Sequence, residues 1–446
     1  MSKRIVLLGA GESGVGAAIL AKKNGYNVFV SDAGWIKPAY KQELEEWEVD
    51  YEEKQHSPGK ILNADEVMKS PGIPEKNEMV KSIRQKGIPV ISEVELAYRH
   101  KGEAKIVGIT GSNGKTTTTA LTYHICKHAE LDCAMVGNIG LSIAKQVALD
   151  PKALYITEIS SFQLDDIREF RPDISVITNI TEDHLDRYDN QVGNYIKSKF
   201  RITMNQSSED HFIYNLDDQT TNDYLSRHNI KTNLLPFTMH NETNPGAFIK
   251  NGIMTIAAAE ERMEMSIYDF ALKGKHNQYN TMAAALSGAR LGIRKEKIRE
   301  AIQSFNSLEH RMEFVSSVRG VEFINDSKAT NVNSTWFALE SMQKPTILIL
   351  GGIDKGNDYT SMRELVKEKV KAIVCLGLDN RKIHEAFYND VPVMVNTASA
   401  EEAVKSAFLL ANKGDVVLLS PACASFDLFK NYEDRGMQFK TAVREL

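Results

Sequence analysis

A short glycine-rich segment between an apolar run and a helix constrains this chain more than any other feature. Residues 106–117 read IVGITGSNGKTT, which predicts a buried strand, a loop of small residues and a helix that begins at Lys115. Glycines let backbone amides approach an anion, and the start of a helix adds a partial positive charge. Lys115 can then reach the outer phosphates of a nucleoside triphosphate, and the Thr116 hydroxyl can bind magnesium. The strict P-loop pattern requires glycine where Ile109 stands, so the segment predicts a variant nucleotide-triphosphate site.

The composition is that of an ordinary globular protein, which limits the classes of function. With 446 residues, the chain is long enough for about two to four domains. Its net charge of −5 gives no sign of a basic surface for nucleic acid or for an anionic membrane. The four cysteines are not clustered as metal ligands are, and no apolar run is long enough for a signal peptide or a membrane span. We therefore expect a reduced, cytoplasmic setting.

The first hundred residues predict a small α/β domain that binds a phosphate-bearing ligand. An apolar strand at 4–8 leads into the loop GAGESG and a helix, and Asp32 follows the next strand at 27–31. This order is typical of a dinucleotide-binding fingerprint, in which the acid contacts a ribose, but it does not by itself specify NAD. A turn that begins at Ser70 either closes over the same ligand or only ends a strand. Alternating strands and helices continue to about residue 99.

Polar residues follow three predicted strands of the central region. Glu158 lies in the strand at 153–159, and the carboxyl end of a strand beside a phosphate loop can anchor magnesium. The loop NITEDHLDRY, which contains His184, follows the strand at 174–178. Two interpretations of this loop remain, a solvated acidic segment and a ligand site. Its position after a strand of the same sheet favours a ligand site. Asn138 occupies a similar position after a third strand.

Residues 211–270 predict a small antiparallel patch, because short strands of alternating polarity appear there. The segment 247–254 alternates in polarity and contains Asn-Gly, which is the signal of a hairpin turn. The polar segment KGKHNQYN at 273–280 then precedes a predicted helix at 281–291. Its side chains either cap that helix or face the adenine of a bound nucleotide.

The last third predicts another domain, from about residue 307 to the end. Strands at 321–324, 346–350 and 416–419 each lead into a loop of small and polar residues. Loops of this kind at the carboxyl ends of strands are typical of an open α/β sheet with a ligand crevice.

Taken in order, eight motifs resemble those of the Mur ligases, the ATP-dependent amide ligases of peptidoglycan synthesis. The motifs are TGSNGKTT, GNIG, EISSFQLD, NITEDHLDRY, KGKHNQYN, HRMEF, NDSKATN and SPACASFDLFKNYEDRG. Each is weak alone, whereas eight in order are specific, and the resemblance covers essentially the full length. It is closest to the members that add D-glutamate. The family's TGxNGK[ST] loop explains why the strict pattern fails.

The resemblance implies a fold of three α/β domains. These are an N-terminal Rossmann-like domain that binds the UDP substrate (1–99), a central P-loop ATPase-like domain with a small antiparallel patch (100–306) and a C-terminal Rossmann-like domain that binds the amino acid (307–446). The first fingerprint would then hold UDP rather than NAD. We expect a cytoplasmic monomer that works without nucleic acid or membrane.

The resemblance also implies the reaction. The carboxylate of UDP-N-acetylmuramoyl-L-alanine attacks the γ-phosphate of ATP, and the amine of D-glutamate then displaces phosphate from the acyl phosphate through a tetrahedral intermediate. Because three anions meet, cations are needed: Lys115, Arg311, Lys328, Lys355 and two magnesium ions. Lys199 is implied to be carbamylated by carbon dioxide, which turns an ammonium without an acceptor into an oxygen ligand.

The resemblance assigns four groups of site residues. The catalytic residues are Lys115, Glu158, His184 and Lys199, and the metal ligands are Thr116, Glu158, His184 and carbamylated Lys199. The ATP-binding residues are Gly111, Asn113, Gly114, Lys115, Thr116, Thr117, Asn277, Arg311 and Asp326. The UDP-substrate residues are Glu12, Ser13, Asp32, Ser70, Asn138 and His184, and the D-glutamate residues are Thr330, Lys355, Ser425 and Tyr432. Two residues depart from the family pattern, since Glu12 replaces an apolar residue and Tyr432 replaces phenylalanine.

Three other functions remain open. The chain could be a sister ligase for another amino acid, such as L-alanine or a diamino acid, or a folylpolyglutamate-type ligase. It could also be a nicotinamide dehydrogenase that uses the first domain, or a P-loop switch without ligase chemistry. Phosphate release that depends on an amino acid separates a ligase from a switch, and the absorbance of reduced nicotinamide tests the dehydrogenase.

Overall fold

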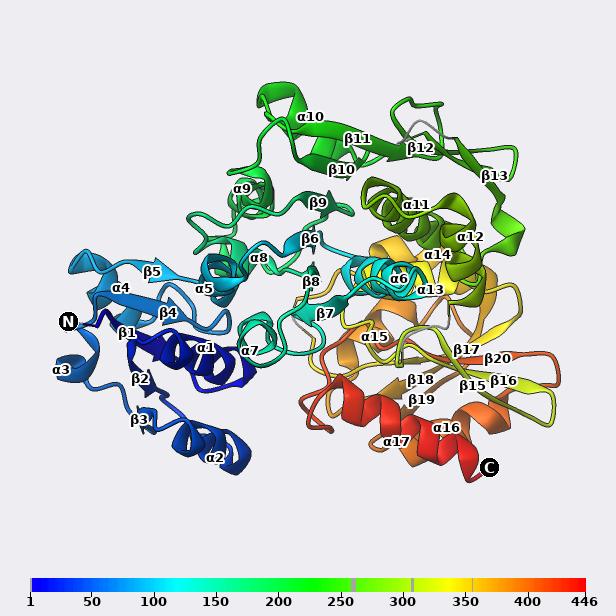
Figure 1. Ribbon diagram of the computed structural model, residues 1–446. Coiled ribbons are helices and arrows are strands. Elements are labelled where there is room, and N and C mark those ends of the chain that lie inside the picture. Colours follow the sequence, from blue (N-terminus) through cyan, green and yellow to red (C-terminus); the bar gives the residue numbers. More distant parts are fainter. Residues whose placement is uncertain (1, 258–261, 306–308, 355) are drawn as a thin grey trace. The chain divides into compact units, whose positions relative to one another are not determined.

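The computed structural model describes residues 2–257, 262–305, 309–354 and 356–446, and the chain divides into two compact units (Figure 1). The first unit comprises Met1–Ala271 and Asn277–Phe305, and the second comprises Leu272–His276 and Asn306–Leu446. The expected domain boundary between residues 306 and 307 lies outside the described residues. Helices alternate with mostly parallel strands in three sheets, so the predicted α/β fold class is confirmed.

The first unit begins with a five-stranded parallel sheet in the order β3-β2-β1-β4-β5. Its strands are β1 (Arg4–Leu8), β2 (Asn27–Ser31), β3 (Asp50–Glu52), β4 (Glu66–Lys69) and β5 (Val90–Ile91). Its helices are α1 (Glu12–Lys23), α2 (Pro38–Glu46), α3 (Pro58–Ile61), α4 (Glu78–Gln85) and α5 (Glu93–His100). The strands predicted at 4–8 and 27–31 are confirmed, because apolar runs of this length suit strands that are buried on both faces.

A nine-stranded sheet follows in the same unit, in the order β14-β13-β12-β11-β10-β9-β6-β8-β7. Its strands are β6 (Lys105–Thr110), β7 (Cys133–Gly137), β8 (Leu154–Glu158), β9 (Ile174–Ile177), β10 (His211–Asn215), β11 (Asn233–Thr238), β12 (Gly246–Lys250), β13 (Ile253–Ala257) and β14 (Met263–Ser266). Its helices are α6 (Lys115–His128), α7 (Ile143–Leu149), α8 (Ser161–Leu164), α9 (Val192–Phe200), α10 (Gln219–Arg227), α11 (Lys275–Arg290) and α12 (Lys295–Ser304). The sheet is parallel except at β12–β14, where the predicted Asn-Gly hairpin pairs Phe248 with Thr255.

The predicted start of the helix after KGKHNQYN is wrong. We expected the helix to begin at Thr281, but α11 begins at Lys275 and takes most of the motif into its first turns. Two of these polar contacts lie inside the helix, where the Thr281 hydroxyl donates to the Asn277 carbonyl at 2.7 Å and Asn280 Nδ2 donates to Asn277 Oδ1 at 3.2 Å. Local bonds of this kind let residues that usually cap a helix lie within it.

The second unit contains a six-stranded sheet in the order β15-β16-β20-β17-β18-β19. Its strands are β15 (Glu313–Val318), β16 (Val321–Asn325), β17 (Thr346–Leu350), β18 (Val370–Leu376), β19 (Met394–Thr397) and β20 (Val416–Leu419). Its helices are α13 (Val332–Ser341), α14 (Arg363–Lys369), α15 (Arg381–Phe387), α16 (Ala400–Leu410) and α17 (Tyr432–Arg444). Only β15 is antiparallel to its neighbour, so β16 to β20 carry their following loops at one edge.

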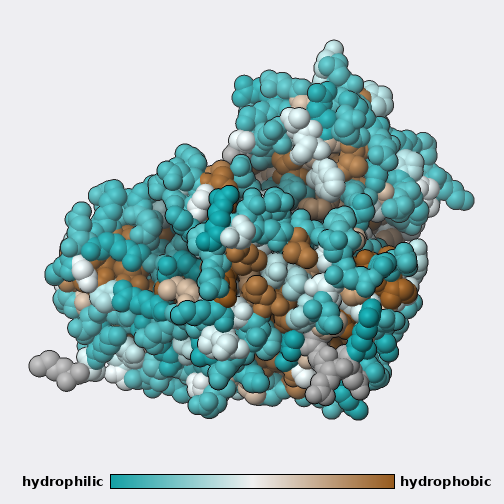
Figure 2. Space-filling view, turned by 90° about the horizontal axis from the view of Figure 1, so that it is seen from above, coloured by the Kyte–Doolittle hydropathy of each residue, from teal (hydrophilic) through white to brown (hydrophobic). Residues whose placement is uncertain are grey.

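The surface is largely polar. Hydrophilic residues cover most of the face shown in Figure 2, and the apolar areas on it are separate patches. In the part of the chain that the structure describes, none of the helices combines the length and the apolar character that a membrane crossing requires.

A buried carboxylate connects the two sheets of the first unit. Glu95 in α5 is 0% exposed and accepts hydrogen bonds from the backbone amides of Arg168, Glu169 and Phe170 at 2.8–3.1 Å. The guanidinium of Arg99 donates to the same carboxylate at 2.9 Å. The guanidinium neutralises the buried charge and the three amides stabilise it by hydrogen bonding, so this contact fixes the end of the first sheet against the second.

Glu95→Gln should therefore destabilise the first unit. The substituted amide places an N–H₂ group against backbone donors, and we expect the free energy of unfolding to fall by about 2–4 kcal/mol. Urea denaturation followed by circular dichroism measures the loss. Glu169→Gln is the matched control, because that side chain is exposed. Equal midpoints for Glu95→Gln and the parent would contradict this role of the carboxylate.

Candidate active site

The segment between β6 and α6 has the geometry of a phosphate-binding loop. Gly111 and Gly114 adopt left-handed φ angles of +145° and +84°. A Cβ at these positions would collide with the side chains of Thr178 and Asn280, respectively. Gly114 precedes α6, whose first turn carries backbone amides that the helix itself cannot use. The loop can therefore present these amides to an anion.

The carboxyl end of β9 holds this loop in place. The backbone amides of Ser112 and Asn113 donate to the carbonyl and the side-chain oxygen of Asn179, at 2.8 and 3.0 Å. The Thr178 hydroxyl and Asn179 Nδ2 both donate to the Asn113 carbonyl, at 2.5 and 3.0 Å. Because all these partners belong to the protein, the loop is shaped before any ligand binds.

Two lysines meet at one carbonyl of the loop. Lys115 Nζ donates to the Gly111 carbonyl at 2.8 Å, and Lys199 Nζ from α9 donates to the same oxygen at 2.7 Å. Lys199 is only 1% exposed. Burial and the nearby charge of Lys115 hold the pKa of the Lys199 amine well below its usual range, which favours its neutral form.

A carboxylate and an amide meet beside the loop. Glu158 ends β8 and is 1% exposed. Asn138, which follows β7, donates Nδ2 to Glu158 Oε1 at 2.9 Å and its backbone amide to the Glu158 carbonyl at 2.9 Å. This double contact fixes two of the predicted residues against each other.

The acidic loop that contains His184 packs against its surroundings. His184 adopts a left-handed φ of +52° and its ring lies 5.2 Å from the ring of Phe162. The Arg187 guanidinium lies over the same Phe162 ring at 4.3 Å and donates to the Pro71 carbonyl at 3.1 Å. The loop therefore touches the turn that follows β4, so it is more than a solvated acidic segment.

These elements surround one cavity of about 340 Å³ in the first unit. Its lining residues are Pro71, Gly72, Lys115, Asn138, Ser160, Ser161, Phe162, Asp183, His184, Arg187, Tyr195 and Lys199. The fold thus brings together four predicted residues from separate segments of the chain: Lys115, Asn138, His184 and Lys199. Thr116, the next residue after Lys115, does not line the cavity, and neither does Glu158, which Asn138 contacts.

Four predicted residues lie at the carboxyl edge of the first sheet. Glu12 and Ser13 begin α1, Asp32 follows β2 and Ser70 follows β4. Asp32 joins two loops there, because Oδ2 accepts from the Ala10 amide at 2.6 Å and Oδ1 accepts from the Gly34 amide at 2.7 Å. Asp32 therefore shapes the loop that begins α1, in addition to any contact with a ribose.

Six of the predicted site residues belong to the second unit, whereas Asn277 lies in α11 within the first. Arg311 precedes β15, Asp326 follows β16, Thr330 precedes α13, Ser425 follows β20 and Tyr432 begins α17. Lys355 lies outside the described residues. Asp326 is 5% exposed and accepts from the Ser420 hydroxyl at 2.8 Å. Burial raises the pKa of Asp326 to about 7, against the opposing charge of Arg311.

Sequence reasoning missed the residue that holds the loops of the second unit together. Arg435 in α17 is 1% exposed, and its guanidinium donates to the carbonyls of Ser327, Cys423 and Gly351 at 2.8, 3.1 and 3.4 Å. These carbonyls follow β16, β20 and β17, and burial lowers the pKa of Arg435 to about 10. The sequence signal that could have identified Arg435 is its position in the last motif, SPACASFDLFKNYEDRG. Asn280 in α11, which crowds the phosphate loop, was missed in the same way.

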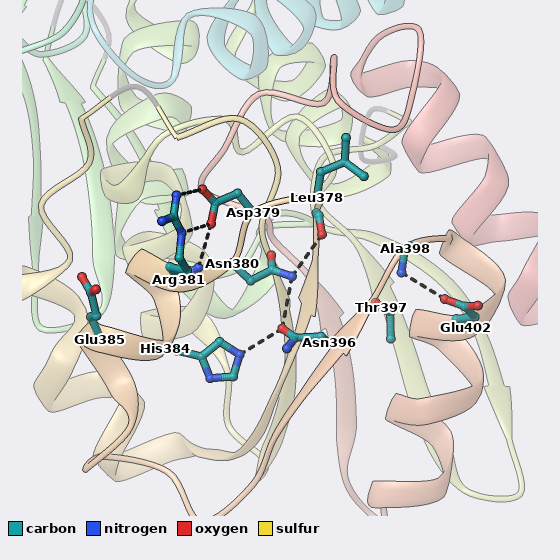
Figure 3. Close-up of a pocket in the computed structure, with 11 residues that line it drawn as sticks. Leu378, Asp379, Asn380, Arg381, His384, Glu385, Asn396, Thr397, Ala398 and Glu402 are labelled. Carbon is teal, nitrogen blue, oxygen red and sulfur yellow. Dashed lines mark hydrogen bonds and ion pairs between the residues drawn. The ribbon is translucent and has the colours of Figure 1, made fainter.

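A larger cavity, of about 890 Å³, lies in the second unit at the carboxyl ends of β18 and β19 (Figure 3). None of the predicted site residues that the structure describes lines it. Arg381 donates to Asp379 at 2.7 Å there. His384 Nε2 lies 2.9 Å from Asn396 Oδ1. Because the smaller cavity in the first unit brings together four of the predicted residues, it is the better candidate for chemistry.

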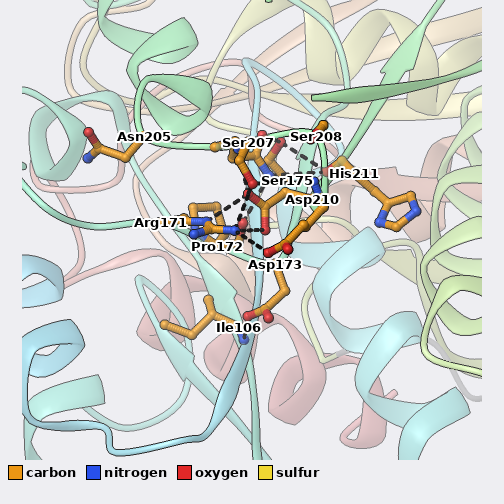
Figure 4. Close-up of polar contacts among 12 residues, drawn as sticks. Ile106, Arg171, Pro172, Asp173, Ser175, Asn205, Ser207, Ser208, Asp210 and His211 are labelled. Carbon is orange, nitrogen blue, oxygen red and sulfur yellow. Dashed lines mark hydrogen bonds and ion pairs between the residues drawn. The ribbon is translucent and has the colours of Figure 1, made fainter. Parts of the chain in front are cut away.

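Polar contacts close the amino edge of the nine-stranded sheet, opposite the phosphate loop (Figure 4). Asp173 Oδ2 accepts from the Ile106 amide at 2.8 Å, which joins the starts of β9 and β6. Asp210 Oδ2 accepts from Arg171 Nε at 2.7 Å and from the Ser207 amide at 2.6 Å. With this edge occupied by internal bonds, the carboxyl edge is the one that remains for ligands.

Comparison with known proteins divides the chain into three matched segments. Residues 4–79 match the MurD N-terminal domain, residues 109–288 match the Mur ligase middle domain and residues 310–423 match the glutamate ligase domain of Mur ligases. The order of the matches along the chain is the order of the three sheets.

Three relatives are 49–53% identical to this chain over essentially its full length. The UDP-N-acetylmuramoylalanine–D-glutamate ligase of Christiangramia forsetii is 53% identical over 446 residues, which are 100% of both chains. The enzyme of the same name from Bacteroides fragilis is 53% identical over 445 residues, again 100% of both chains. That of Porphyromonas gingivalis is 49% identical over 444 residues, which cover 99% of this chain and 98% of the relative.

Solved structures share the fold at low identity. A pseudomurein peptide ligase from Methanothermus fervidus has a TM-score of 0.64 at 20% identity, and the UDP-N-acetylmuramate–alanine ligase of Thermotoga maritima has a TM-score of 0.63 at 16% identity. Both comparisons cover 100% of each chain. The full-length relatives and the three matched domains show that this chain belongs to the Mur ligase family.

Proposed function

We propose that this chain is an ATP-dependent ligase that joins D-glutamate to UDP-N-acetylmuramoyl-L-alanine and releases ADP and phosphate. The names of the full-length relatives, at 49–53% identity, support the substrates. The observation that carries the chemistry is the meeting of Lys115 and Lys199 at the Gly111 carbonyl, in a cavity that also includes Asn138 and His184. A cation at Lys115 surrounded by polar groups suits a reaction between anions.

The proposal assigns one substrate to each part of the chain. UDP-N-acetylmuramoyl-L-alanine binds residues 1–99 together with Asn138 and His184, ATP binds mainly residues 100–306, and D-glutamate binds residues 307–446. We place the reaction in the synthesis of peptidoglycan precursors in the cytoplasm, by a monomer. Arg311, Asp326 and Asn277 contact ATP in this assignment.

The first step is phosphoryl transfer to a carboxylate. A carboxylate oxygen of the substrate attacks the γ-phosphorus of ATP, and the bond between that phosphorus and the bridging oxygen of ADP breaks. Lys115 and the amides at the start of α6 stabilise the charge that spreads over the phosphate oxygens. The loop needs little rearrangement for this, because the end of β9 already holds it.

Magnesium fits the donors near the loop as a partner of ATP. Among the residues that the structure describes, no three His, Cys, Asp or Glu side chains cluster as an all-protein metal site. Magnesium usually takes one or two protein ligands and completes its shell with phosphate oxygens and water. Thr116, Glu158 and His184 suit that chemistry and would hold the ion, which would neutralise charge on the phosphates.

Lys199 fits carbamylation. A neutral amine can attack carbon dioxide, so that an N–C bond forms, a proton leaves and a carbamate with two oxygens results. Burial and the charge of Lys115 favour the neutral amine that this step requires. The carbamate oxygens can then serve a metal, which the ammonium cannot do.

The second step is aminolysis of the acyl phosphate. The amine of D-glutamate attacks the carbonyl carbon, a proton leaves the nitrogen, and the C–O bond to phosphate breaks as the tetrahedral intermediate collapses. We assign D-glutamate to Thr330, Lys355, Ser425 and Tyr432. The choice of the D isomer rests on the names of the relatives.

Phosphate release with a panel of amino acids tests the function. With ATP and UDP-N-acetylmuramoyl-L-alanine present, D-glutamate should stimulate release, whereas L-glutamate, L-alanine and a diamino acid should not. Stimulation by another amino acid alone would indicate a sister ligase, and release that needs no amino acid would indicate a switch.

Lys115→Ala should nearly abolish phosphate release. The outer phosphates lose a close cation, and the loss in kcat expected for such a clamp is on the order of 10²–10³-fold or more. Lys127→Ala, an exposed lysine on the same helix, is the control and should behave like the parent. A near-normal kcat for Lys115→Ala would refute the phosphate loop.

Lys199→Ala should be nearly inactive and partly rescued by short carboxylic acids, which replace the missing oxygens. Lys197→Ala is the control on the same helix, since Lys197 is exposed. Carbon NMR after incubation with ¹³C-labelled bicarbonate should show a carbamate signal in the parent and none in Lys199→Ala. A parent without that signal would contradict carbamylation even if Lys199→Ala is inactive.

A further inference from the structure

A second buried carboxyl group lies on α5, two residues before Glu95. Glu93 is 0% exposed, as Glu95 is. Its Oε1 accepts from the Ser142 hydroxyl at 2.5 Å and from the Ala144 amide at 3.1 Å, both at the start of α7. Its Oε2 is buried and accepts no hydrogen bond from the residues that the structure describes. One oxygen of this carboxyl group is therefore satisfied, and the other is not.

The charges around Glu93 are used elsewhere. Glu95 on the same helix pairs with Arg99 at 2.9 Å, and Lys145 on α7 pairs with a carboxylate of α2 at 2.6 Å. The charged groups of β4, which also packs against α5, have other partners: Glu66 pairs with Arg99, and Lys69 pairs with Asp166. Within the described part of the chain, no ion pair includes Glu93.

These surroundings favour a protonated Glu93. Burial and the like charge of Glu12, at the start of α1, raise the pKa of Glu93. If the carboxyl group were ionised, a buried charge would lack a cation and one of its oxygens would lack a donor. A proton on Oε2 removes both costs, because an O–H group is itself a donor.

The first turn of α1 supplies an acceptor for this proton. The Ser13 hydroxyl lies within hydrogen-bonding reach of the Glu93 carboxyl group. Gly16 follows one turn later on the same face of α1, and a Cβ there would lie 2.1 Å from Ser142 Oγ. The helix therefore approaches closely the groups that surround Glu93, and Ser13 is one of the residues assigned above to the UDP substrate.

We propose that Glu93 is a positioning residue that keeps its own proton and thereby turns the Ser13 hydroxyl toward the diphosphate of the UDP substrate. The inference rests on the proposed function, because it requires a diphosphate at the start of α1. A hydroxyl group has one proton and two lone pairs. When Glu93 donates to Ser13 Oγ, the serine proton is free for a phosphate oxygen. An ionised Glu93 would accept that proton and leave only lone pairs for the phosphate.

Glu93→Gln tests the protonation state, because the glutamine amide keeps an acceptor for α7 and a donor for Ser13. In titration calorimetry of the full-length protein with UDP-N-acetylmuramoyl-L-alanine, Glu93→Gln should bind like the parent. Ser13→Ala should bind about 10- to 150-fold more weakly, as expected for a lost hydrogen bond to a charged group. Unchanged ADP binding shows that both variants are folded.

Three results of this titration would overturn the proposal. Tighter binding by Glu93→Gln would mean that the parent carboxyl group is ionised and holds the Ser13 proton. Weaker binding by Glu93→Gln would mean that Glu93 acts in another way. Parent-like binding by Ser13→Ala would mean that the Ser13 hydroxyl does not contact the substrate.

Two measurements without substrate test the proton itself. The infrared difference spectrum between the parent and Glu93→Gln at neutral pH should contain the carbonyl stretch of a protonated carboxyl group. Glu93→Gln should also keep the urea midpoint of the parent, whereas Glu95→Gln, the matched control with a paired carboxylate, should lower it. A missing band, or equal losses for the two variants, would contradict the proposal. Substrate binding without the band makes only this proposal wrong, and the band without substrate binding makes the proposed function wrong.

Discussion

The site depends on the Gly111 carbonyl, which accepts hydrogen bonds from the side-chain amines of both Lys115 and Lys199. Burial and the charge of Lys115 disfavour a second ammonium at this oxygen, so the Lys199 amine favours its neutral form. A phosphate at the loop, or a carbamate on Lys199, would place negative charge beside the Lys115 ammonium. The site is therefore built to receive negative charge, which is the physical reason that it suits a phosphoryl donor and a carboxylate acceptor.

The rest of the first unit keeps these two lysines in place. Bonds of Asp173 and Asp210 close the amino edge of the nine-stranded sheet, and the end of β9 shapes the loop at the other edge. Glu95 fixes the first sheet to the second through backbone amides. Because these contacts are internal and charge-assisted, the carboxyl edges of both sheets can carry polar loops without loss of order.

One buried cation, Arg435, holds the loops of the second unit together. Its loops converge from β16, β17 and β20, and each offers a carbonyl to Arg435. A planar guanidinium has five donors in a fixed arrangement, so it can hold several loops where a lysine would hold fewer. The predicted residues Asp326 and Ser425 stand on two of these loops, which links their positions to Arg435.

The sequence by itself determined the features that depend on neighbouring residues: the phosphate loop, the Asn-Gly hairpin, the strand before Asp32 and the order of the motifs. It misplaced the start of α11, because polar side chains that suit a cap also bond within a helix. Only the tertiary structure decided that Lys199 is buried beside the Lys115 ammonium, that Arg435 contacts three loops and that Trp35 is exposed. These properties arise from residues far apart in the chain, where burial and charge are set by packing rather than by any local pattern.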